Sequence, residues 1–142
     1  MTDIDQDWGA VRHDVAARNR RYAIEGRLHK LTLLVAGLLA YSAFGNFVAA
    51  AMVVRTSPTD VWIGVVLGTL YALGVYRVWL KDDTRWWPVA VPAGLTIAWL
   101  LLVWWATGIF APIPIVLNAA LLVLVPLRAR TAAALTSLTR EA

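Results

Sequence analysis

The chain of 142 residues contains no cysteine and few charged residues. The absence of cysteine excludes disulfide bonds, thiolate metal sites, iron–sulfur clusters and cysteine nucleophiles. Only 15% of the residues are charged and 60% are hydrophobic, whereas an average soluble domain has about 25% charged and about 45–50% apolar residues. So few charges cannot cover the surface of a water-soluble globular domain, and so many apolar residues exclude a disordered chain.

Four long stretches of the sequence contain almost no charged residues. Arg77 is the only charged residue within them, and all others lie between or outside the stretches. Each stretch has about the 20 apolar residues that a helix needs to cross the hydrocarbon core of a bilayer. They are continuously apolar rather than alternating, which excludes barrel strands. Short polar or proline-containing segments separate them. The stretches are residues 31–54, 61–80, 86–107 and 109–127.

The sequence therefore predicts an all-α membrane protein with four antiparallel transmembrane helices. The transmembrane domain covers residues 31–127, between a basic N-terminal tail (1–30) and a C-terminal tail (128–142). If both tails are cytoplasmic, twelve of the thirteen lysines and arginines lie on the inner side and only Arg55 lies outside. This distribution follows the positive-inside rule, and the tryptophans fall near both expected interfaces.

We therefore expect a location in a cell membrane, or in a viral envelope derived from one, with both termini inside. Anionic lipids of the inner leaflet are the expected partners of the basic residues. We interpret the net charge of +4 as a consequence of the basic residues that flank the membrane spans. No nucleic-acid partner is expected, because the chain has no soluble module that could present a base-reading element.

Apolar residues of the N-terminal tail recur at helical spacing between arginines, which predicts an amphipathic interfacial helix. The apolar residues are Trp8, Val11, Val15 and Tyr22. Arg18, Arg20 and Arg21 are candidate contacts to lipid headgroups or to a partner. We interpret this helix either as an anchor that fixes the orientation of the chain in the membrane or as a docking element for a cytoplasmic partner.

Ionisable groups are missing from the centres of the four stretches, which removes the usual coupling site for protons or cations. The notable polar residues there are Tyr41, Asn46, Tyr71 and Asn118. They are candidates for hydrogen bonds between helices, or alternatively for the lining of a polar pocket. Arg77 and Arg85 are candidate headgroup contacts at the inner interface, which Arg77 can reach by snorkelling.

Gly64 and Gly68 form a GxxxG motif in the second stretch. Such a motif allows the backbone of another helix to approach closely. The partner is either a helix of the same chain or a second copy.

Motifs for catalysis or cofactor binding are missing. His13 and His29 form no HExxH motif, and neither lies within a span, where a haem ligand would be needed. The chain has no glycine-rich phosphate loop and no GxSxG motif. We therefore expect no cofactor, no metal and no enzymatic activity. An enzyme acting on lipid would need Arg77 and Arg85 to meet Asp82 or Asp83 at the inner interface.

Three segments resemble those of small, uncharacterised four-span membrane proteins. They are the aromatic-basic end of the second span (73–79), the opening Arg85-Trp86-Trp87-Pro88 of the third, and the asparagine-containing segment 116–122 of the fourth. The resemblance covers residues 31–127 and implies an architecture. For function we expect a structural, scaffold or accessory-subunit role, with a larger membrane complex or a second copy as partner. The alternative is a small channel or transporter for a neutral or anionic solute.

Overall fold

The computed structural model describes residues 3–55 and 57–140, without the side chains of residues 3–10, 13 and 140. The described chain contains helices and no strand. The elements are α1 (Asp3–Val53), α2 (Pro58–Val75), the π-helical turn η1 (Tyr76–Leu80), α3 (Trp87–Thr107) and α4 (Pro112–Arg140). Four helical segments are long and apolar enough to cross a membrane. The predicted all-α class with four long apolar helices is thereby confirmed.

Local sequence signals explain where the helices begin and end. The Ser57 hydroxyl accepts a hydrogen bond from the backbone of Asp60 and caps α2, which begins at Pro58, and proline suits the first turn because its missing N–H needs no partner there. Gly108 ends α3 with a φ of 73°, a left-handed conformation that glycine adopts without steric cost. Pro112 then begins α4.

The N-terminal tail is not a separate helix. It continues without a break into the first apolar stretch, so that α1 is one helix of 51 residues, about 76 Å long. No proline interrupts residues 3–53, and charge alone does not end a helix. The described side chains from Val11 to Ala23 are exposed whether they are basic or apolar. The prediction of a distinct amphipathic interfacial helix is therefore not supported. The side chains of Trp8 and His13 lie outside the description.

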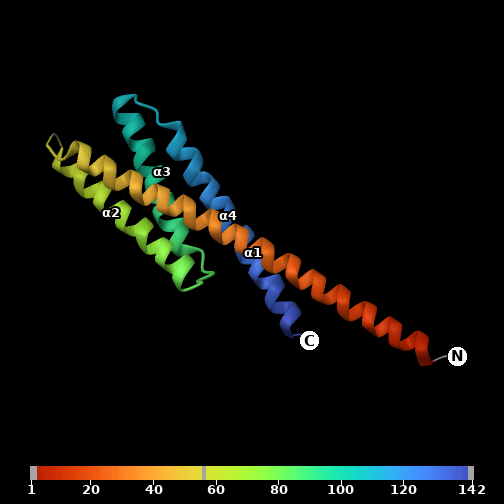
Figure 1. The fold of residues 1–142 in the computed structure, drawn as a ribbon. Helices are drawn as coiled ribbons and strands as arrows, with labels where there is room; N and C mark the ends of the chain where they lie inside the picture. The colour runs from red at the N-terminus through yellow and green to blue at the C-terminus, as the bar shows by residue number, and fades with distance from the viewer. Residues whose placement is uncertain (1–2, 56, 141–142) are drawn as a thin grey trace.

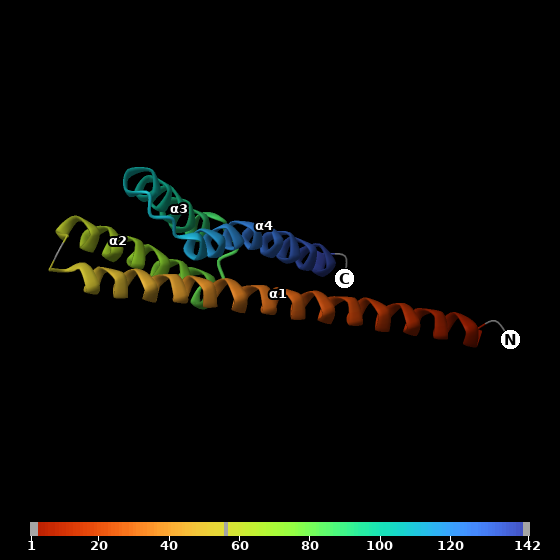
Figure 2. The ribbon, with the colours of Figure 1, turned by 90° about the horizontal axis from the view of Figure 1, so that it is seen from above.

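The helices form two pairs. α1 packs along α2, α3 packs along α4, and α1 also contacts α4 (Figures 1 and 2). α1 extends well past the other helices at its N-terminal end (Figure 2). Both termini lie toward the end of the molecule opposite the α1–α2 connection (Figure 1). In both views the end of α3 next to α4 stands away from the α1–α2 pair.

The tightly packed core occupies only one half of this arrangement, toward the α2–α3 connection. Its buried side chains are Val35, Ala36, Leu39, Ala43, Leu67, Tyr71, Val78, Val89, Ala93, Leu121 and Val125. Many large apolar side chains elsewhere are exposed, including Trp105 at 84% and Met52 at 80%. Exposed apolar surface on this scale is unusual for a soluble monomer, and it is compatible with lipid as the surrounding solvent.

The GxxxG motif lies in the seam between α1 and α2. A Cβ at Gly64 would lie 2.9 Å from the Cβ of Ala50, and a Cβ at Gly68 would lie 2.9 Å from the ring of Phe47. Both glycines therefore let the backbones of these two helices approach closely.

Candidate functional site

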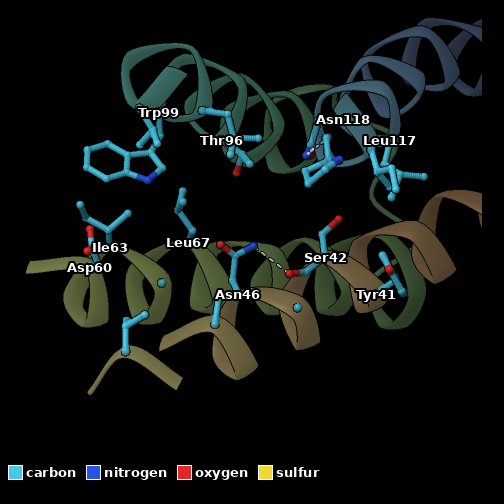
Figure 3. A pocket seen from close by; sticks show the side chains of 18 residues that line it. Tyr41, Ser42, Asn46, Asp60, Ile63, Leu67, Thr96, Trp99, Leu117 and Asn118 are labelled. Carbon is cyan, nitrogen blue, oxygen red and sulfur yellow. Dashed lines mark hydrogen bonds between the residues drawn. The ribbon is translucent and has the colours of Figure 1, made fainter. Parts of the chain in front are cut away.

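A cavity of about 480 Å³ lies between the two helix pairs (Figure 3). Its lining comes from residues 41–53 of α1, 60–67 of α2, 96–103 of α3 and 113–118 of α4. On every helix these residues are the ones nearest the α1–α2 and α3–α4 connections. The cavity therefore occupies the half of the bundle that the core leaves unfilled.

Two features of the structure leave this space open. The end of α3 diverges from the α1–α2 pair (Figure 2). In addition, α1 presents Gly45 and Ala49 to the cavity, and a Cβ built at Gly45 meets nothing within 4 Å. Toward the opposite end the large side chains of Leu39, Tyr71 and Leu121 are fully buried and fill the corresponding space.

A buried polar cluster lies at the end of the cavity nearer the packed core. The Tyr71 hydroxyl lies 2.8 Å from Thr96 Oγ1 and 3.2 Å from the carbonyl oxygen of Pro92, and it also hydrogen-bonds to Asn118 Oδ1. The Asn118 amide donates to the carbonyl oxygen of Pro114 at 2.8 Å. Tyr71, Thr96 and Asn118 are all buried. The cluster joins α2, α3 and α4, and Thr96 and Asn118 also line the cavity.

The structure thus brings together only part of the predicted polar set. Tyr71 and Asn118 are hydrogen-bonded to each other. Asn46 and Tyr41 line the same cavity, but the Asn46 amide donates to Ser42 O within its own helix, at 2.8 Å. Tyr41 is 61% exposed on the cavity wall. Thr96, which completes the cluster, was not among the predicted residues.

The basic residues of the tail lie on the exposed part of α1. Arg18 pairs with Asp14 at 3.3 Å, and Arg21 pairs with Glu25 at 2.9 Å. Both pairs have i,i+4 spacing and exposed side chains, so each contributes only a few tenths of a kcal/mol to helix stability. Arg20 is also exposed.

Arg77 of η1 and Arg85, the two arginines predicted to contact headgroups, lie at and in the α2–α3 connection, where both interact with Asp83. Arg77 Nη1 lies 3.6 Å from Asp83 Oδ2, and its guanidinium carbon lies 5.5 Å from the centre of the Trp87 ring. The backbone N–H of Arg85 donates to Asp83 Oδ1 at 3.0 Å. Asp83 therefore stabilises the connection itself.

Arg128 is the charged residue whose role the sequence did not reveal. It is only 3% exposed. Its guanidinium donates to Thr32 Oγ1 at 3.0 Å, to the backbone oxygen of Asp83 at 2.6 Å and to Asp82 Oδ1 at 3.3 Å. These bonds attach α4 to α1 and to the α2–α3 connection. The signal in the sequence was two adjacent acids, Asp82 and Asp83, between the second and third apolar stretches and an arginine directly after the fourth.

No group of three or more histidine, aspartate or glutamate side chains in the described part of the chain is arranged to hold a metal ion. Comparison with known proteins finds no matching family, curated protein or solved structure.

Proposed function

We propose that the protein is an integral membrane protein with four antiparallel spans and both termini in the cytoplasm. Its role is that of an accessory or scaffold subunit that binds a protein partner through the exposed end of α1. The four apolar helices and their exposed apolar side chains support the membrane location. The positive-inside distribution of arginine and lysine supports the orientation.

The observation that carries the proposed role is the projecting segment, residues 3–23 of α1. It extends beyond the other helices (Figure 2) for about 31 Å. Its i,i+4 ion pair between Asp14 and Arg18 stabilises a helix whose described side chains from Val11 to Ala23 are all exposed. Exposed charges of both signs together with exposed valines suit a protein surface better than a purely anionic lipid surface.

A channel or transporter is the second candidate, and the cavity is the observation that favours it. The packed core around Leu39, Tyr71 and Leu121 separates the cavity from the opposite end of the bundle, so transport would require a second conformation. Asp60 in the cavity lining favours a neutral over an anionic solute. That the chain is not an enzyme and takes no cofactor stays a prediction.

The orientation can be tested directly because the chain contains no cysteine. Single cysteines are introduced at the exposed positions Thr59, Thr84 and Ala133 and are labelled with a membrane-impermeant maleimide. Thr59→Cys should react in intact cells, whereas Thr84→Cys and Ala133→Cys should react only after permeabilisation. The opposite pattern would overturn the orientation. Labelling of Thr59→Cys and Thr84→Cys from the same side would overturn the four-span topology.

The accessory role is tested by native mass spectrometry of the protein extracted gently from its own membrane. A larger protein should co-purify at fixed stoichiometry. Arg20→Glu in the projecting segment should weaken this association, whereas Arg130→Glu, an exposed arginine of α4, should not. A protein that is recovered without any partner, or a complex that is insensitive to Arg20→Glu, would contradict the proposal.

A further inference from the structure

The cavity has the chemical character of a binding site for an uncharged molecule. Of the eighteen residues that line it, Asp60 is the only charged one, and Asp60 lies at one end, in the first turn of α2 (Figure 3). The remaining lining is apolar or neutral and polar. A charged group placed beside Ser42 and Asn46, away from the Asp60 end, would lose its hydration without gaining a partner of opposite charge.

Neutral polar groups from opposite walls face each other across the cavity. Figure 3 shows Ser42 and Asn46 of α1 facing Thr96 and Asn118 of the other helix pair, with the Trp99 indole further toward Asp60. The Asn46 amide nitrogen is engaged with Ser42 O. Within the described residues, no hydrogen bond within the protein engages Asn46 Oδ1, the Ser42 hydroxyl or the Trp99 indole N–H, and all three residues line the cavity.

These groups offer one acceptor, one hydroxyl that can donate or accept, and one donor. Apolar surface from Ile63, Leu67 and Leu117 lies beside them (Figure 3). Known ligand sites combine this pattern of a few polar groups in a largely apolar lining with volumes of about 300–1,000 Å³. The cavity volume of about 480 Å³ lies within this range.

We propose that the cavity binds a small, uncharged amphipathic molecule. A hydroxyl head group donates to Asn46 Oδ1 and accepts a hydrogen bond from the Ser42 hydroxyl or the Trp99 indole, and the apolar remainder packs against Ile63, Leu67 and Leu117. This inference is independent of the accessory role, because it depends on the cavity and not on the projecting segment.

The test uses photolabelling of the full-length protein in dodecyl maltoside with 3-azioctanol, a neutral amphipathic alcohol. Peptide mapping by mass spectrometry should find saturable adducts in residues 41–49 and 96–103, suppressed by excess 1-octanol. Octanoate and octylammonium have the same chain length but carry charge, and they should compete at least about tenfold more weakly. Adducts spread evenly over the exposed apolar surface without saturation would overturn the proposal. Equal competition by octanoate or octylammonium would overturn the requirement for an uncharged ligand.

A pair of glycine variants on one helix provides the matched control. A Cβ at Gly45 or at Gly37 meets nothing within 4 Å, but only Gly45 lines the cavity. Gly45→Phe should fill the cavity and lower saturable labelling by about tenfold or more, whereas Gly37→Phe should leave it unchanged. Circular dichroism verifies that both variants are folded. Equal labelling of the two would show that the cavity is not the site.

Asn46→Leu is the second variant if Gly45→Phe does not fold. Among the described residues the Asn46 amide bonds to Ser42 O of its own helix, so the bundle should remain intact. The affinity for 1-octanol should fall by about fivefold or more, the loss expected when one hydrogen bond to the ligand is removed. An unchanged competition curve for 1-octanol in Asn46→Leu would contradict the assigned head-group position.

Discussion

Replacement of Arg128 with methionine tests how α4 is attached to the rest of the bundle. The Arg128 guanidinium is buried and donates to Thr32 Oγ1, to the backbone oxygen of Asp83 and to the Asp82 carboxylate. Methionine keeps much of the apolar stem that packs beside these groups, but it donates no hydrogen bond. The substitution therefore isolates the polar contribution of Arg128.

The three hydrogen bonds should contribute unequally to the free energy of unfolding. The Asp82 side chain is 84% exposed, so its ion pair with Arg128 contributes at most about 1 kcal/mol. The Asp83 carbonyl oxygen loses its donor at a cost of about 1–3 kcal/mol. Removal of the buried guanidinium also relieves its desolvation, which offsets part of the loss. The expected net decrease for Arg128→Met is about 2 kcal/mol, roughly thirtyfold in the unfolding equilibrium.

The free energy is measured by titrating the purified protein in dodecyl maltoside with sodium dodecyl sulfate and following helix content by circular dichroism. Arg130→Met is the matched control, because Arg130 is exposed on the same helix, and its effect should stay within about 0.5 kcal/mol. Asp82→Asn should cost less than about 1 kcal/mol. An Arg128→Met variant that is no less stable than Arg130→Met would show that the buried hydrogen bonds do not hold α4 in place. An Asp82→Asn variant that is as destabilised as Arg128→Met would show that the ion pair carries the attachment instead.

The same titration tests contacts elsewhere in the bundle. Tyr71→Phe removes the hydroxyl bonded to the buried Asn118 and should lower the free energy of unfolding by about 1–3 kcal/mol; a change below about 0.5 kcal/mol would contradict the described hydrogen bonds. Gly74→Ala would place a Cβ 2.7 Å from the backbone oxygen of Pro88, which cannot rotate away, and should cost about 1–3 kcal/mol. Gly68→Ala meets only a phenylalanine ring at 2.9 Å, which can shift, and should cost less; the reverse order would count against the geometry of these seams.

The sequence predicted the helical class because the length and apolarity of a span are local properties. Residues 86–107 contain no charge, and the structure has α3 from Trp87 to Thr107. The continuity of α1 was missed because the boundary at residue 30 was inferred from charge, whereas persistence of a helix depends on the backbone. For a similar reason α4 continues to Arg140, since charged residues after an apolar stretch do not end a helix.

The site was only partly predictable because it depends on how helices rotate and offset against one another. Tyr71 and Asn118 were recognisable as polar residues within apolar stretches, but they are 47 positions apart in the sequence. Periodicity assigns each to a face of its own helix and does not determine which faces meet. Arg128 was assigned to the C-terminal tail because it directly follows the last apolar stretch. Its partners Asp83, Asp82 and Thr32 lie 45, 46 and 96 positions away in the sequence.

Because α1 is one continuous helix, it can transmit motion from one of its ends to the other as a rigid rod. One wall of the cavity and the projecting segment belong to the same helix, which continues without interruption from one to the other. The projecting segment is about 31 Å long. A change of 10° in the tilt of α1 about the point where it leaves the bundle therefore moves the far end of the segment by about 5 Å. A ligand that spreads or draws together the cavity walls would therefore shift any protein held at that end, through rigid-body motion alone.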